Sequence, residues 1–540
     1  MILVNGDIYT VDASLGRAAA FAVESGRFSA VGTNDAILAL ADTKTQIIDA
    51  SGHTVVPGFI DSHSHTSGNS PQVAGVDLSY IVDKKEWLRL IAGADKTMPE
   101  GEWIIGGYWD HTLSDSIFPT RQMIDSVVAD RPVFLSHIDG HYGWANSIAL
   151  ELADISAETK APPGGEVVLD PETGKPTGIL LEGAQGLVRK VIPARTDAQR
   201  RNGLAEMQQY ANSFGITGLH QMGDLEDYAY IVAHGDPSIR VWYGQWGPRG
   251  SKADYSEDTK SYLGRQSATR ETVRKSGREG RLGPLLEVGF VKLMNDGVLS
   301  AHTAVLLEEY SDREGWKGEY ITEPKDLEKQ VSAFNAAGIP VAVHSIGDAA
   351  VNATLDAYEA ALAYEVPYPN RIEHIEIIAP TDVARFRRLG VVASMQPNHG
   401  TNSIAYVPVR VGVMREAQAY VWRTMLTFGV PLVFGADYPT SPLNPLVQIA
   451  DAVLRTSPFG FNAGKPWHPE QSVSFEQALY AYTQAGASIT AWKNEIGSIS
   501  VGKWADFVVL DGSVSTPLDK RFRELSVDYT YFAGNEVYRK

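Results

Sequence analysis

The stretch Val55-Val56-Pro57-Gly58-Phe59-Ile60-Asp61-Ser62-His63-Ser64-His65 marks where the main domain is expected to begin. An apolar strand-type run follows a Pro-Gly breaker and leads to two histidines at positions i and i+2. On an extended backbone both imidazoles project to the same face. Such a pair supplies half of the coordination shell of a zinc-type ion. The alternative is that the pair lies in a polar surface loop, because serine and threonine residues surround it. Whether the chain offers further metal ligands at other strand ends decides between a metal site and a surface loop.

Composition is that of a large globular protein. A chain of 540 residues is too long to form a single ordinary hydrophobic core. Hydrophobic residues make up 44% of it and charged residues 21%. The 47 basic and 65 acidic residues give a net charge of −18, which argues against a nucleic-acid or anionic-membrane partner. The chain contains no cysteine. Any metal must therefore bind His, Asp, Glu or a modified Lys.

Neither a targeting signal nor a membrane span is expected from the sequence. Residues 1–7 include no basic segment followed by an apolar core, so no signal peptide is expected. No run reaches the roughly 18 consecutive apolar residues that a spanning helix needs. We therefore expect a cytoplasmic protein that acts on a small molecule and has no membrane partner.

Both chain ends are expected to form short β-strands. Turn signals such as Asn5-Gly6 and Ser25-Gly26 separate the strands before residue 57. Residues 497–511 and 527–537 have the same strand character. This pattern predicts one small β-sandwich domain made of residues 1–57 and 495–540.

Residues 58–494 are expected to form a barrel domain. From about residue 196, helix-type segments alternate with strands expected at 216–220, 288–294, 340–344, 372–374, 391–395 and 431–436. Such alternation indicates a parallel sheet, and the number of units favours an α/β fold of the (β/α)8 TIM type. The irregular regions at roughly 67–130 and 145–195 are interpreted as insertions after the first barrel strands.

Polar side chains follow the apolar runs where the predicted strands end. Catalytic groups of a barrel belong at this end of the strands. Beyond the two histidines, the strand ends offer Lys292, His344, His374 and Asp437. Each has a plainer interpretation: a solvated lysine, hydrogen-bonded core or rim histidines, and an aspartate that caps the next helix.

The ordered set of motifs resembles the amidohydrolase superfamily, most of all its YtcJ-like branch, which includes N-substituted formamide deformylases. The matching motifs are PGFIDSHSH (57–65), VKLMNDG (291–297), VHSIGD (343–348), RIEH (371–374) and FGADYP (434–439). The resemblance covers nearly the whole chain. It implies a metal-dependent hydrolase on a barrel fold, and a homodimer is expected from the resemblance alone.

The resemblance also implies a role for each residue at the strand ends. His63, His65 and Asp437 would bind one metal ion, and Asp437 would take a proton from the attacking water. It would then pass this proton to the leaving nitrogen. The metal would be Zn²⁺ or another divalent transition metal, as one or two ions.

A second ion would lie beside the first. By the resemblance, Lys292 would carry a CO2-derived carbamate that bridges the two ions, and His344 and His374 would hold the second one. A carbamate turns a cationic lysine into an anionic oxygen ligand, as such a bridge requires.

The implied reaction is hydrolysis of a carbon–nitrogen amide bond by metal-activated hydroxide attack on the carbonyl. N-substituted formamides or N-acyl amines are the leading substrates. A deaminase, or a hydrolase of cyclic amides, carbamates or lactones, is an alternative on the same fold. Lys292 favours the binuclear hydrolase over the deaminase. A catalytically dead scaffold is the remaining alternative, and the retention of every expected ligand argues against it.

Four residues are candidate substrate contacts: His399, Trp109, His141 and His302. His399 is the first choice. His302 stands where many relatives carry a different, often basic, residue. For Trp109, packing in the core of the insertion is an equally favoured alternative. His220 is a further candidate to line the pocket, and for it a structural role is equally favoured.

Overall fold

The computed structural model describes residues 1–540 apart from 68–74, 100, 112, 116, 139, 141, 163–164, 224, 249–251 and 459. These residues form two compact units, Met1–His65 with Gln208–Lys540, and Thr66–Met207. The predicted β domain belongs to the first unit, and the predicted barrel domain of residues 58–494 is divided, with residues 66–207 in the second unit and the rest in the first. The boundary between the β domain and the barrel domain stays a prediction. His141 lies outside the described residues.

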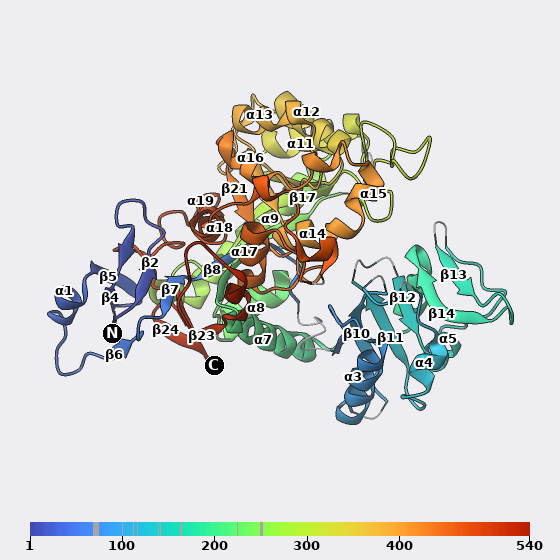
Figure 1. Ribbon diagram of the computed structural model, residues 1–540, viewed down its shortest axis with the longest axis horizontal. Coiled ribbons are helices and arrows are strands. Elements are labelled where there is room, and N and C mark those ends of the chain that lie inside the picture. Colours follow the sequence, from blue (N-terminus) through green and yellow to red (C-terminus); the bar gives the residue numbers. More distant parts are fainter. Residues whose placement is uncertain are drawn as a thin grey trace. The chain divides into compact units, whose positions relative to one another are not determined.

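An eight-stranded parallel sheet forms the centre of the first unit (Figure 1). Its strands are, in sheet order, β8 (Phe59–Ser64), β15 (Ile216–Gln221), β16 (Arg240–Trp246), β17 (Leu286–Met294), β18 (Val341–Ser345), β19 (Arg371–His374), β20 (Val392–Met395) and β21 (Leu432–Phe434). An isolated parallel bridge between Ser64 and Tyr438 connects the two ends of the sheet. The predicted TIM-type barrel is confirmed.

Helices follow the barrel strands, as the alternation predicted. They include α8 (Leu225–His234), α9 (Ser256–Ser276), α11 (Pro324–Ala336), α12 (Asp348–Ala360), α13 (Pro380–Leu389), α16 (Trp422–Thr427) and α17 (Pro445–Leu454). Helix α13 illustrates how the sequence sets the first and last residues of such a helix. Pro380 occupies its first turn, where a missing N–H costs nothing, and Gly390 ends it in the left-handed conformation with φ +67°.

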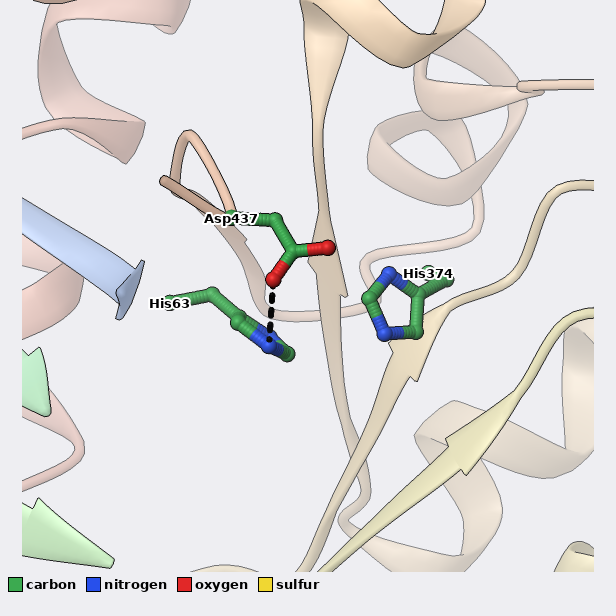
Figure 2. Close-up of side chains that lie close together, drawn as sticks. All are labelled: His63, His374 and Asp437. Carbon is green, nitrogen blue, oxygen red and sulfur yellow. Dashed lines mark ion pairs between the residues drawn. The ribbon is translucent and has the colours of Figure 1, made fainter. Parts of the chain in front are cut away.

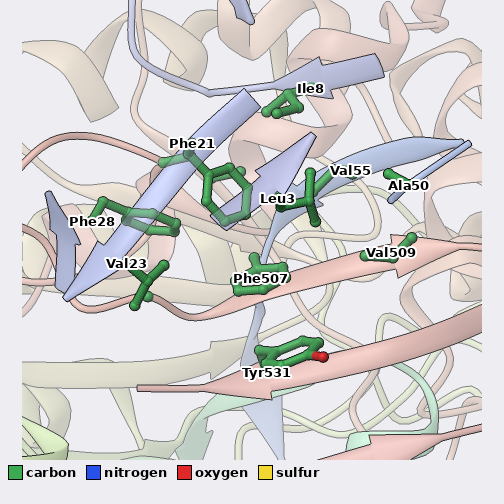
Figure 3. Close-up of a cluster of buried hydrophobic side chains, with 12 residues drawn as sticks. Leu3, Ile8, Phe21, Val23, Phe28, Ala50, Val55, Phe507, Val509 and Tyr531 are labelled. Atoms are coloured by element: carbon green, nitrogen blue, oxygen red, sulfur yellow. The ribbon is translucent and has the colours of Figure 1, made fainter. Parts of the chain in front are cut away.

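Two smaller sheets of the first unit are built from the chain ends. One has the order β5 (Arg27–Gly32), β4 (Ala20–Glu24), β1 (Ile2–Val4), β6 (Ile47–Asp49). The other has the order β24 (Asn535–Arg539), β23 (Val527–Phe532), β22 (Phe507–Leu510), β7 (Thr54–Pro57), β2 (Asp7–Tyr9), β3 (Arg17–Ala18). Figure 3 shows Leu3 and Phe21 of the first sheet in one core with Phe507 and Val509 of the second. The two ends of the chain thus share a hydrophobic core.

The unit Thr66–Met207 has a sheet and a core of its own. Its strands are, in sheet order, β13 (Glu166–Leu169), β14 (Pro176–Leu181), β12 (Tyr142–Ala145), β11 (Val133–His137), β10 (Ile104–Trp109) and β9 (Val76–Asp77). Helix α3 (Lys84–Thr97) contributes Trp87 to a core that also contains Trp109 and Trp144. Strands β11 and β12 lie between the two predicted insertions and belong to this same sheet.

None of the helices that the structure describes combines the length and the apolar composition needed to cross a membrane.

Candidate metal centre

The two histidines of the opening stretch meet Asp437. His63 lies on β8 and His65 directly follows it, while Asp437 follows β21. The Nε2 atoms of both histidines lie 3.2 Å from Asp437 Oδ1. In each ring Nδ1 faces an oxygen that can only accept a hydrogen bond: Glu373 for His63 at 2.6 Å, and the carbonyl of Met222 for His65 at 3.2 Å. Nδ1 is therefore a donor in each ring, and Nε2 is the nitrogen that faces Asp437 and is available to a metal ion.

Close backbone packing holds β8 and the end of β21 together. The carboxylate of Asp61 accepts the backbone N–H of His63 at 3.0 Å and that of Ala436 at 2.9 Å. A Cβ atom on Gly435 would lie 2.4 Å from the backbone nitrogen of His63, so only glycine fits there. The next residue but one, Asp437, has φ +57°. Such strain persists only where the surrounding structure enforces it.

His374 at the end of β19 completes a group of three. Ligand atoms of His63, His374 and Asp437 all lie within 4.8 Å of one another (Figure 2). The ring of His344 on β18 is 4.5 Å from that of His374, between centroids. Burial, together with the charge on Lys292, lowers the pKa of His344 to about 3. Burial and His344 likewise lower the pKa of His374 well below its usual value, so both rings are neutral, the form that binds metal ions.

Lys292 on β17 is buried beside these groups. Within the described chain, its Nζ atom has no hydrogen-bond partner. Burial lowers the pKa of Lys292 to about 8, although Glu373 and Asp437 oppose this shift. A buried ammonium group without an acceptor is costly. The lowered pKa makes the neutral amine, the form of lysine that can react with CO2, far more abundant near neutral pH than in an exposed lysine.

A buried ion network supports His63, and sequence reasoning gave its members no such role. Glu373 Oε1 lies 2.6 Å from Arg371 Nε, and Arg371 Nη1 lies 2.8 Å from His220 Nδ1. Burial favours the neutral acid, yet Arg371 and His63 hold the pKa of Glu373 well below its usual range. An anionic partner behind a ligating histidine fixes the tautomer of the ring and raises its basicity. His220 thus belongs to this support.

The alternation of β-strands explains why Glu373 was overlooked. Neighbouring residues of a strand point to opposite faces, so Glu373 and His374 were not expected to share a site. His374 has φ +76°, which interrupts that alternation. Both side chains consequently reach His63: a Glu373 oxygen lies 2.6 Å from Nδ1, and the His374 ring centroid is 4.8 Å away. Gln396 in turn lies 2.9 Å from His374 Nδ1.

Trp246 is a second residue that sequence reasoning missed, because strand β16 was not predicted. Its ring stacks on His65 with centroids 5.8 Å apart and an interplanar angle of 11°. The residue is 42% exposed. A cavity of about 150 Å³ is lined by Trp246, Gly247, Pro248, Lys292, Met294 and Thr322. The apolar run from Val241 to Tyr243 was the available signal for this strand.

The predicted substrate contacts fall in different places. His399 lies on α14 (Pro397–Asn402), with its Nε2 3.9 Å from Asp437 Oδ2. His302 lies 3.0 Å from Asp312. Trp109 is fully buried in the core of the unit Thr66–Met207, which favours a packing role, and its indole N–H donates to the carbonyl of Leu135 at 3.0 Å. The roles of these residues in substrate binding stay predictions.

Comparisons with known proteins agree with this architecture. The protein LONG AFTER FAR-RED 3 of Arabidopsis thaliana is 31% identical over 100% of this chain and 91% of its own. The putative amidohydrolase YtcJ of Bacillus subtilis is 29% identical, over 99% and 98% of the two chains. The N-substituted formamide deformylase of Arthrobacter pascens is 29% identical, over 99% and 97%. The crystal structure of an uncharacterized metal-dependent hydrolase from Pyrococcus furiosus gives a TM-score of 0.72 at 26% identity, over 96% and 99%.

The family model for amidohydrolases matches residues 46–538. This match takes in all eight strands of the barrel and the strand ends that carry His63, His374 and Asp437. Because the match extends over nearly the whole sequence, the chain belongs to the amidohydrolase family and is a hydrolase.

Proposed function

We propose that the protein is a metal-dependent hydrolase that cleaves the carbon–nitrogen bond of an N-substituted formamide or an N-acyl amine, releasing a carboxylate and an amine. One observation carries the proposal: His63 and His65 each direct Nε2 at the same oxygen of Asp437, at 3.2 Å. The similarity to an N-substituted formamide deformylase supports the substrate class. The likeness to a structure described as a metal-dependent hydrolase supports the need for an ion.

The residues present fit a divalent transition metal. Two imidazoles and a carboxylate are ligands that Zn²⁺ prefers, and bonds of about 2.0–2.2 Å around a tetrahedral ion place neighbouring ligand atoms about 3.3 Å apart. Burial and Lys292 oppose a positive charge on His63, but Asp437 and Glu373 outweigh them and raise its pKa. A field that favours a proton at this point also favours a metal cation.

The unpartnered Nζ of Lys292 is the observation that supports a carbamate. Carboxylation would replace a buried cation by a carbamate, whose two oxygens share one negative charge, close to the neutral rings of His344 and His374. These three residues would hold a second ion, with Zn²⁺ as the leading candidate for both positions. One ion bound by His63, His65 and Asp437 is the alternative occupancy.

The chain's own residues account for the proton transfers. A divalent ion held here supplies acidification of a water and polarisation of the substrate carbonyl. Burial opposes ionisation of Asp437, yet His63 and His65 hold its pKa well below the usual value, so Asp437 is an ionised carboxylate, the form that can take up a proton. Asp437 would take the water proton and return it to the leaving nitrogen. His399 would orient the substrate beside Asp437 Oδ2.

The cavity that Lys292 helps to line is the place we propose for the substituent of the substrate. Trp246, Pro248 and Met294 contribute apolar side chains to its lining, and Lys292 and Thr322 contribute polar ones. A volume of about 150 Å³ accommodates a small aromatic or branched aliphatic group. We assign it to the substituent of the amide.

A product screen at defined metal loading tests the proposal. Metal-free protein is incubated with Zn²⁺ and bicarbonate, then offered N-benzylformamide, N-acetylbenzylamine, a benzyl carbamate, a lactone and an aminopyrimidine. We expect benzylamine from the first two substrates only after metal loading. Ammonia release from the aminopyrimidine alone would identify a deaminase, and turnover of only the carbamate or the lactone would also overturn the proposal. Full activity without metal would remove the ion from the reaction.

A further inference from the structure

The unit Thr66–Met207 contains its own group of metal-ligating side chains. Asp110, His111 and His137 each offer one ligand atom, and these atoms lie within 4.8 Å of one another. His111 Nδ1 is 3.3 Å from His137 Nε2, and that nitrogen is 3.6 Å from Asp110 Oδ1. The proposed amide hydrolysis assigns no role to these three residues.

The topology of the sheet brings this group together. Strands β10 and β11 are parallel, so their carboxyl ends lie at the same edge. His137 is the last residue of β11, and Asp110 and His111 directly follow β10. Ligands of α/β proteins are bound in crevices outside the carboxyl ends of parallel strands. The group therefore occupies the edge of the sheet where a binding site is expected.

A local irregularity in β10 aims the side chains at this edge. The register passes from Gly107 opposite Ser136 to Trp109 opposite His137, and so skips Tyr108. Tyr108 has φ +57°, a conformation that is strained for a bulky residue. Bulges of this kind redirect side chains next to functional sites.

Aromatic neighbours fix the orientation of both imidazoles. Phe118 stacks on His111 with centroids 4.4 Å apart, and Trp109 contacts His137 edge to face at 4.6 Å. Tyr142 packs against the same two rings at 5.9 and 4.9 Å. The His137 side chain is 4% exposed and that of Asp110 is 15% exposed. Ligands that are held in place before binding lose little freedom when an ion arrives.

We propose that Asp110, His111 and His137 form a binding site for a divalent transition-metal ion, with zinc as the leading candidate. Around a tetrahedral ion with bonds of about 2.0–2.1 Å, ligand atoms are about 3.3 Å apart. The observed separations of 3.3 and 3.6 Å are close to this spacing. Three protein ligands leave a fourth position for water or for a ligand, as in exchangeable rather than closed structural zinc sites.

The experiment counts metal ions on the full-length chain and does not depend on turnover. Purified protein is stripped, loaded with Zn²⁺, freed of excess ion and analysed by mass spectrometry for zinc per chain. The double variant His63→Asn/His65→Asn removes ligands of the barrel group. In this background we expect His111→Gln to lower the zinc content by about one further equivalent, and the exposed His234→Gln to leave it unchanged.

Cobalt gives a second readout of the same site. Co²⁺ bound to the His63→Asn/His65→Asn protein should show visible absorption bands of tetrahedral intensity, and these should be lost in His111→Gln. The proposal would be overturned if the His63→Asn/His65→Asn protein had the same zinc content and the same cobalt spectrum with and without His111→Gln. A hydrogen bond between the two imidazoles would then explain why they lie close together. Circular dichroism of each variant reports folding, so loss of metal is separable from unfolding.

Discussion

The two histidine–aspartate groups of this protein are built in different ways. The barrel group draws on strands that are far apart in the sequence; the contact between His63 and Glu373, for example, joins residues 310 positions apart. The group of Asp110, His111 and His137 comes from two neighbouring parallel strands, and His111 and His137 are only 26 positions apart. Charged and hydrogen-bonding partners surround the barrel group, with Trp246 stacked on His65, and three aromatic rings pack against the imidazoles of the other group. The comparison indicates that buried charges accompany the proposed chemistry, and that aromatic contacts contribute to the orientation of the second group.

The largest effect is expected from Asp437→Asn. Removing the only carboxylate oxygen that faces both His63 and His65 in the described chain removes the proposed proton acceptor. Turnover of N-benzylformamide should fall by about 10³-fold, within the range of general base catalysis. Steady-state kinetics at saturating Zn²⁺ measure this loss, with the exposed Asp236→Asn as the matched control. Activity within tenfold of the unchanged protein would exclude Asp437 from proton transfer.

Glu373→Gln tests electrostatic support against aromatic support. The amide can still accept a hydrogen bond from His63 but carries no charge, so metal affinity in the barrel should fall by about 10- to 100-fold. Phe118→Leu in the other unit removes a stacking contact worth about 0.5–1.5 kcal/mol, which corresponds to a weaker affinity by roughly two- to tenfold. Competition with a chelator measures both affinities. Equal losses would show that the two kinds of support do not differ.

Lys292 should react with CO2 in a pH-dependent manner. Its pKa is lowered to about 8, so the neutral amine becomes the main form as the pH rises through that value. From pH 7 to pH 9 the neutral fraction rises about tenfold for a group of this pKa. Carbon-13 NMR of metal-free protein in labelled bicarbonate should show a carbamate signal that grows over this interval. Lys292→Arg should remove the signal, and a signal that persists in this variant would come from another amine.

Gly435→Ala is expected to lower stability. The added methyl group would lie 2.4 Å from the backbone nitrogen of His63, so β8 and the end of β21 must move apart. Overpacking of this kind costs about 1–3 kcal/mol, a few degrees in the thermal midpoint. Gly93→Ala in helix α3, where a Cβ atom meets nothing within 4 Å, is the control and should not lower the midpoint. Equal midpoints for both variants would show that the barrel tolerates the separation.

Much of the barrel could be predicted from the sequence, because buried parallel strands are apolar runs whose last residues are polar. His63, His374 and Asp437 were found on this basis. The pattern failed at β16, where Arg240 and Gly244 interrupt the apolar run. It also failed at Glu373, because regular alternation places neighbouring side chains on opposite faces, and only the backbone angle of His374 reveals the exception.

The sequence by itself determined most strands of the barrel, the polar residues at their ends, the absence of thiolate ligands and the resemblance to the family. These features are local or compositional, so each can be seen without knowing what lies nearby. Only the tertiary structure decided that Asp437 faces both histidines of the opening stretch, that Glu373 supports one of them, and that Asp110, His111 and His137 meet at a sheet edge. These contacts between residues that are distant in the sequence depend on strand register, barrel closure and single backbone torsion angles. None of these can be read from the local periodicity of the sequence.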